Sequence, residues 1–77
     1  MISVGDLLNN GSALVLHVTT DFVFCFDMDK REYVSWSIDS KNNTFCGHYF
    51  SDIFCALGDY KKRVFKDLQV LSSNKIF

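Results

Sequence analysis

The sequence predicts an α+β domain: a four-stranded antiparallel meander sheet packed by one C-terminal amphipathic helix, with a short N-terminal helical segment. Three observations predict this fold class. Apolar residues alternate with a period of two in four successive runs, polar turn residues separate those runs, and the period changes to about 3.6 after residue 51. The chain has 77 residues, which is enough for a single domain over residues 1–77.

Short polar turns join the four expected strands, as in antiparallel hairpins. The run Phe22–Phe26 is apolar on both faces, so we expect this strand to be central and covered on both sides. In the next run, Glu32–Asp39, apolar residues alternate with polar ones, which is typical of a strand with one solvent-exposed face. In the last run we expect Phe45, Gly47 and Tyr49 to share one face. The expected strands are Ala13–Thr19, Phe22–Phe26, Glu32–Asp39 and Thr44–Phe50.

Two segments are expected to be helical. Val4–Leu8 predicts one or two turns that end at the Asn-Asn-Gly turn at residues 9–11. A longer helix is expected to start after Ser51 as the N-cap residue, with Asp52 in its first turn. The tail Gln69–Phe77 is either a short extra strand or a docked segment.

The long helix is amphipathic and is expected to run for four to five turns. Basic and acidic residues lie on the face opposite an apolar stripe. We expect this stripe, which Phe54 and Phe65 widen, to pack on the sheet. The other residues of the stripe are Ile53, Ala56, Leu57, Tyr60, Val64 and Leu68.

Composition excludes several classes of function. The chain has 8 basic and 9 acidic residues and a net charge of −1, which argues against bulk capture of nucleic acid or anionic lipid. No segment reaches the roughly 20 apolar residues of a membrane span, and the start does not resemble a signal peptide. The three cysteines include no close pair, which favours reduced thiols in a cytoplasmic protein. A chain of this length buries too little to build a deep pocket, so we expect no cofactor.

One helix can cover only one face of a sheet. The other face would carry either the phenylalanines of Phe22–Phe26 or the apolar residues of Val34–Ile38, and the short N-terminal segment is too small to cover it. We therefore expect a protein partner, a homodimer or both. Aromatic residues are common in interface hot spots, and acidic loop residues could imitate phosphates. The candidate partner-binding residues are Asp27, Asp29, Glu32, Tyr33, Trp36 and Tyr49.

Metal binding and nucleophilic catalysis are two weighed alternatives. Cys46 and His48 would share a strand face, and Cys25 and Cys55 could complete a set of four zinc ligands. The tight cysteine pairs of structural zinc sites are absent, so Cys25 and Cys46 are interpreted as small core residues. Cys46 and His48 with Asp52 could also form a catalytic dyad with its orienting group. Their backbones would stand about 7 Å apart, which is long for that hydrogen bond. No catalytic residue and no metal ligand is predicted.

Single-stranded nucleic-acid binding is the alternative function. Four basic residues cluster on the long helix, and aromatic side chains on an open sheet face could stack on bases. Asp59 and Asp67 dilute this cluster, and the net charge is unfavourable for tight binding. The basic residues are Lys61, Lys62, Arg63 and Lys66.

The runs Glu32–Asp39 and Thr44–Asp52 resemble a pattern of small uncharacterised phage and mobile-element proteins of low-GC bacteria. The shared features are a YVxW strand, a polar turn, a GHYF strand and an amphipathic helix, over about half of the chain. Proteins of this size and context include inhibitors of bacterial immunity, such as anti-CRISPR proteins. The resemblance implies an inhibitor that covers a surface of a defence nuclease complex without catalysis. It assigns no functional residue, because the matched positions are structural.

Overall fold

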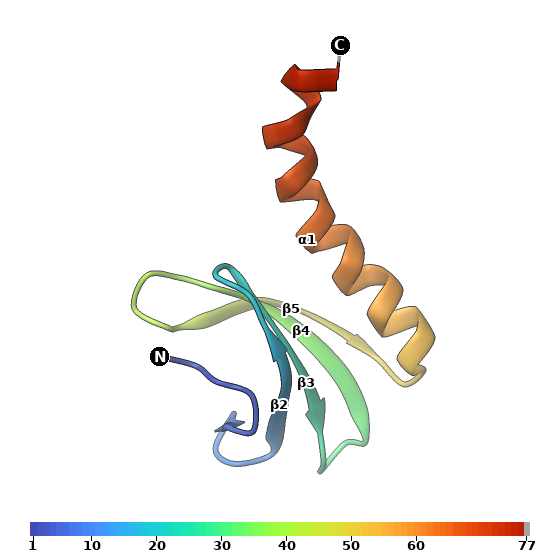
Figure 1. Ribbon diagram of the computed structural model, residues 1–77. Helices are drawn as coiled ribbons and strands as arrows, with labels where there is room; N and C mark the ends of the chain where they lie inside the picture. Colours follow the sequence, from blue (N-terminus) through green and yellow to red (C-terminus); the bar gives the residue numbers. More distant parts are fainter. Residues whose placement is uncertain (77) are drawn as a thin grey trace.

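A computed structural model of the chain shows a curled antiparallel sheet of five strands with one C-terminal helix (Figure 1). It describes the backbone of residues 1–76 and the side chains of residues 1–66. The strands lie in sequence order, each antiparallel to the next, so the sheet is a meander. The elements are β1 (Leu7–Leu8), β2 (Ala13–Val18), β3 (Phe22–Asp27), β4 (Glu32–Ile38), β5 (Thr44–Phe50) and α1 (Ile53–Ile76).

The α+β class, the meander and the C-terminal helix are confirmed, but the strand count and the N-terminal helix were predicted wrongly. Leu7–Leu8 forms a fifth strand, which pairs with the start of β2. Gly5, at φ 94°, lies outside the helical region of the backbone just before this strand. Asn9 and Asn10 then adopt φ of 53° and 59°, a left-handed conformation that asparagine tolerates and that turns the chain into β2.

The sheet face turned away from α1 forms the larger core. Val34 and Trp36 are buried in it, so the expectation that this row could be left uncovered is wrong. Ile2 and Leu8 pack on the row, and the N-terminal segment that carries them lies on the side of the curled sheet away from α1 (Figure 1). The buried members are Ile2, Ala13, Val15, Val23, Cys25, Val34, Trp36 and Ile38.

The opposite face of the sheet packs against the first turns of α1. Phe24 of β3 is buried with Ala56 and Tyr60 of the helix. Since Val23 and Cys25 of the same strand lie in the other core, the prediction that β3 is central and covered on both faces is confirmed. The partly buried residues at the edge of this second core are Phe22, Tyr33, Phe50 and Val64.

The helix begins at Ile53, one residue later than predicted. Asp52 Oδ1 accepts the backbone N–H of Phe54 at 3.0 Å, which satisfies one of the free donors of the first turn. Asp52, and not Ser51, is therefore the N-cap residue of α1. The backbone beyond residue 68 continues the helix as far as Ile76, so the expected alternative of a short extra strand is wrong for residues 69–76, while the docking of their side chains lies outside what the structure describes. Phe77 lies outside the described residues.

Strand β5 contains a β-bulge that the sequence did not predict. Cys46 adopts φ 53°, and the register shifts here, so that Phe45 lies opposite Ser37 while Tyr49 lies opposite Val34. An extra residue in one strand reverses the alternation of faces beyond it. Phe45 and Tyr49, which were expected to share a face, therefore lie on opposite faces of the sheet.

Candidate partner-binding surface

The six predicted partner-binding residues do not form one surface. Asp29 and Tyr49 are exposed, whereas Glu32 and Tyr33 are half-buried and Trp36 is only 8% exposed. Tyr33 lies opposite Phe50 on the α1 face, and Tyr49 lies on the other face.

Asp27 has a structural place in the hairpin between β3 and β4. Its side chain is 2% exposed, and Oδ1 accepts the backbone N–H groups of Asp29 at 3.0 Å and Lys30 at 3.2 Å. A buried carboxylate needs such donors, because burial without them is costly. Asp27 is therefore removed from the acidic surface predicted from the sequence, which leaves Asp29 and the half-buried Glu32 near this tip.

Trp36 and Tyr49 form an aromatic pair that places one ring in the core and the other at the surface. Their ring centroids are 6.3 Å apart and the planes meet at 88°, an edge-to-face arrangement. Gly47 makes room for it, since a Cβ at this position would lie 2.7 Å from Trp36 Nε1 and 2.9 Å from Tyr49 Cε1. Trp36 thus holds Tyr49 in place, with the Tyr49 side chain 49% exposed.

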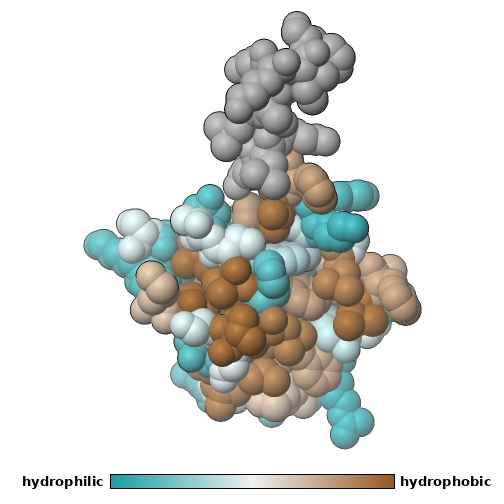
Figure 2. Space-filling view, in the orientation of Figure 1, coloured by the Kyte–Doolittle hydropathy of each residue, from teal (hydrophilic) through white to brown (hydrophobic). Residues whose placement is uncertain are grey.

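The most exposed large apolar side chains of the helix belong to residues that the sequence assigned to the core. Phe54 is 80% exposed, Phe65 is 53% exposed and Leu57 is also exposed. Ala56, Tyr60 and Val64, which the same stripe included, do pack on the sheet. The helix is apolar on two sides, so the sequence pattern alone did not separate the buried side from the exposed one. Figure 2 shows apolar side chains gathered in groups, rather than scattered singly, on one face of the molecule.

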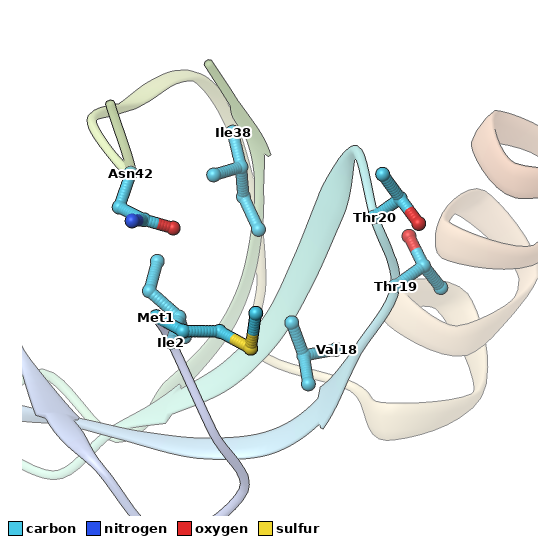
Figure 3. Close-up of a pocket in the computed structure, with 7 residues that line it drawn as sticks. All are labelled: Met1, Ile2, Val18, Thr19, Thr20, Ile38 and Asn42. Carbon is cyan, nitrogen blue, oxygen red and sulfur yellow. The ribbon is translucent and has the colours of Figure 1, made fainter. Parts of the chain in front are cut away.

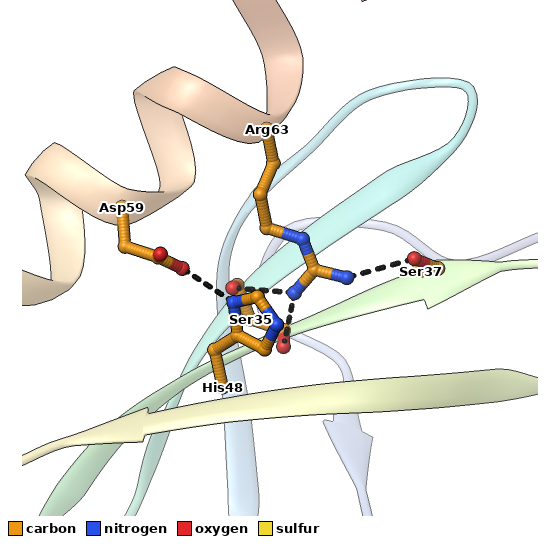
Figure 4. Close-up of polar contacts among 5 residues, drawn as sticks. All are labelled: Ser35, Ser37, His48, Asp59 and Arg63. Atoms are coloured by element: carbon orange, nitrogen blue, oxygen red, sulfur yellow. Dashed lines mark hydrogen bonds and ion pairs between the residues drawn. The ribbon is translucent and has the colours of Figure 1, made fainter. Parts of the chain in front are cut away.

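Figure 4 shows two side chains of α1, those of Arg63 and Asp59, that make polar contacts with the sheet. Arg63 donates hydrogen bonds to the Ser35 carbonyl at 2.9 Å, the Ser35 hydroxyl at 3.0 Å and the Ser37 hydroxyl at 2.8 Å. One turn earlier, Asp59 Oδ2 lies 2.7 Å from His48 Nδ1 on β5. The polar face of β4 was expected to be exposed to solvent. It is instead covered by α1, and the Arg63 guanidinium group binds its serine side chains.

These contacts divide the predicted basic cluster. Arg63 is directed into the helix–sheet interface, and its guanidinium carbon also lies 5.2 Å from the centre of the Phe22 ring. Lys61, Lys62 and Lys66 remain exposed.

The thiol and imidazole groups do not assemble into the alternative catalytic or metal sites. His48 contacts Asp59, while Asp52 accepts a hydrogen bond from the Cys55 thiol at 3.4 Å. This hydrogen bond raises the pKa of Cys55, and burial raises the pKa of Cys25 to about 12, whereas a nucleophilic cysteine needs a lowered pKa. Within the described part of the chain, no three His, Cys, Asp or Glu side chains come close enough to share a metal ion.

A hollow of about 450 Å³ lies between the N-terminal segment and two of the turns (Figure 3). It contains threonine and asparagine side chains beside apolar ones, and no ionisable side chain lines it. Its threonine hydroxyls have no acid or base beside them among the lining side chains, and such a group is needed to activate a hydroxyl as a nucleophile. The lining residues are Met1, Ile2, Val18, Thr19, Thr20, Ile38 and Asn42.

Comparisons of the chain with protein-family models, with curated proteins and with solved structures give no match. Among the described residues, no helix combines the length and the apolar character needed to cross a membrane. The exposed side chains and the sequence pattern of residues 32–52 are therefore the grounds for assigning a function.

Proposed function

We propose that this chain is a non-catalytic binding protein that acts by covering a surface of a protein partner. The observation that carries the proposal is the exposure of large apolar side chains that the fold does not use. Such residues supply most of the energy of protein interfaces when a partner covers them, and single domains rarely gather them on the surface without a use. They are Phe45 and Tyr49 on β5 and Phe54, Leu57 and Phe65 on α1.

Support for a role without catalysis comes from the titratable groups. The raised pKa values of Cys25 and Cys55 keep both thiols protonated. The histidines contact side chains that fix the fold, since His17 Nδ1 lies 3.0 Å from the Tyr60 hydroxyl and His48 contacts Asp59. Cys46, the thiol considered as a nucleophile, lies exposed at the bulge of β5, while His48 is directed toward the helix.

The resemblance of residues 32–52 to small phage and mobile-element proteins directs the choice of partner. We take the partner to be a bacterial defence nuclease complex of the CRISPR type, met in the cytoplasm. A homodimer would use the same exposed side chains. Light scattering after size-exclusion chromatography distinguishes a dimer from the 8.9 kDa monomer.

The experiment is inhibition of target cleavage by reconstituted CRISPR nuclease complexes. We expect inhibition that saturates at about one chain per binding site, with no covalent change to the complex, since a covering protein acts stoichiometrically. Tyr49→Ala should weaken inhibition. Met28→Ala, which truncates an exposed side chain at the β3–β4 turn, is the matched control and should not. Full inhibition at a small fraction of the complex concentration would instead show an enzyme.

A labelled single-stranded oligonucleotide tests the alternative function in the same series. Binding that weakens steeply with salt and is lost on reversing the charge of Lys61 and Lys62 would favour a nucleic-acid-binding module and contradict the proposal.

A further inference from the structure

One side of α1 is turned away from the sheet and carries its own apolar residues. The side that packs on β3, β4 and β5 includes Ala56, Tyr60 and Val64, together with Arg63. At 3.6 residues per turn, the residues 3, 4, 7 and 11 positions after Phe54 share its side, which lies roughly opposite. We call this side the outer face of α1; its residues are Phe54, Leu57, Gly58, Lys61 and Phe65.

The outer face has a gap at Gly58, which carries no side chain. A Cβ built on Gly58 would meet nothing within 4 Å, so no strand or loop among the described residues approaches this position. An open hollow of about 450 Å³ lies over it, lined by Gly58, Lys61, Lys62 and Phe65. The missing side chain lets a group from another molecule reach the helix backbone between the aromatic rings.

The charge around the outer face is positive. Lys61, Lys62 and Lys66 are exposed in its neighbourhood. Of the acidic residues of this segment, Asp59 is directed toward His48 at 2.7 Å, Asp52 caps the first turn of the helix, and Asp67 follows Lys66 in the sequence. The outer face therefore combines apolar side chains with Lys61 among them and with Lys62 and Lys66 along one border, and its electrostatic complement is an apolar surface with carboxylates that face these lysines.

The area of the face indicates that its partner is concave rather than flat. At about 200 Å² per aromatic side chain, the exposed fractions of 80% and 53% leave roughly 160 Å² on Phe54 and 110 Å² on Phe65. A stable interface buries about 800 Å² on each partner, which a flat contact with these rings does not provide. A groove that also covers Leu57 and the aliphatic stems of the lysines adds to the buried area.

We infer that the outer face of α1 docks into an apolar, acid-rimmed groove of a protein partner, as amphipathic helices do in helix-in-groove complexes. This inference rests on the proposed function and names the surface and the chemistry of its partner. A second copy of the chain fits less well, because a symmetric contact brings two copies of the same lysine-rich face together. A lipid surface also fits less well, because Lys61 lies in the middle of the apolar stripe and would enter the membrane with it.

The test uses calcium-loaded calmodulin as the probe, because it presents a methionine-rich apolar groove that accepts basic amphipathic helices. We expect the full chain to bind it saturably in calorimetry and to lose binding when calcium is chelated and the groove closes. Phe54→Ala and Phe65→Ala should each weaken binding about tenfold or more. Charge reversal by Lys61→Glu together with Lys62→Glu should also weaken binding, and this weakening should be larger at low salt than at high salt.

Two matched controls lie elsewhere on the chain. Met28→Ala truncates an exposed apolar side chain at the β3–β4 turn, and Lys41→Glu reverses an exposed charge in the turn before β5. Both should bind calmodulin as the unchanged chain does, and circular dichroism should show the same fold for every variant. No saturable binding up to about 100 μM, or equal weakening by the controls, would overturn the inference. Tighter binding to anionic lipid vesicles than to calmodulin, or a dimer that Phe54→Ala dissociates, would also overturn it.

The same variants separate this inference from the proposed function. Inhibition of a nuclease complex that survives both Phe54→Ala and Phe65→Ala would overturn the docking face and leave the proposed function standing. Calmodulin binding with the expected pattern, without inhibition of any nuclease complex, would support the docking face and contradict the proposed partner.

Discussion

Replacing Gly47 by alanine should destabilise the fold, although the change adds only one methyl group to an edge strand. The added Cβ would lie 2.7 Å from Trp36 Nε1, 3.0 Å from Trp36 Cδ1 and 2.9 Å from Tyr49 Cε1. The Tyr49 ring is half-exposed and can move outward, but Trp36 is buried in the larger core and cannot move without disturbing it. Overpacking of this kind costs about 1–3 kcal/mol.

The magnitude is large enough to measure by thermal unfolding. For a domain of this size, 1 kcal/mol shifts Tm by about 4–8 °C, so Gly47→Ala should lower Tm by roughly 4 °C or more. Circular dichroism measures the unfolding, and the fluorescence of Trp36, the single tryptophan, reports the packing at the site itself. Adding Tyr49→Ala should recover part of the loss, because it removes one of the two crowded rings.

Gly58→Ala is the control with the opposite sign. Nothing lies within 4 Å of a Cβ at Gly58, and alanine is favoured over glycine in a helix by about 1 kcal/mol, so this variant should be more stable. A Gly47→Ala variant as stable as the unchanged chain would refute the reasoning, since it would mean that Trp36 does not pack over this position.

Three further outcomes are expected. Arg63→Leu should cost about 1–2 kcal/mol in urea unfolding, since it removes three partly exposed charge-assisted hydrogen bonds; an unchanged midpoint would show that these hydrogen bonds do not stabilise the fold. A thiol reagent at about pH 8 should titrate two cysteines in the folded chain and all three in denaturant, because Cys25 is fully buried and its pKa is raised to about 12. The backbone N–H of Asn43 holds the pKa of Asp39 below its usual 3.8, so the unfolded chain binds this proton more readily and stability falls as the pH drops below about 4. In Asp39→Asn this acid-dependent loss should be smaller in urea unfolding at successive pH values, and an equal loss would contradict the assignment.

The parts of the fold that repeat a pattern over several residues were predictable from the sequence. The double-sided apolar pattern of Phe22–Phe26 identified β3 as the central strand, because only a strand covered on both faces tolerates it. The change of period after residue 51 located the helix. Strand β1 was missed because two residues are too few to show a period.

Features that depend on a single residue or on contacts between distant residues could not be predicted in this way. A positive φ at Cys46 has no sequence signal, since cysteine has no preference for that region, although the adjacent Gly47 indicated a close approach. Asp27 was interpreted as a surface acid because of its turn position, yet aspartate at the start of a turn often accepts the N–H two residues on. The exposure of Phe54 and Phe65 depended on how α1 is rotated on the sheet, which Arg63 and Asp59 determine through tertiary contacts.

The bulge at Cys46 has a consequence for how copies of the chain meet. Strand β5 is an outer strand of the sheet, and a straight outer strand offers its unpaired backbone groups to any neighbouring chain. The left-handed residue interrupts that row, and it sends Phe45 and Tyr49 to opposite sides, so neither side presents the aligned aromatic ladder of an amyloid zipper. The pairing of further chains along the free edge of β5, which fibril growth requires, is therefore hindered, even though the strand is rich in aromatic residues.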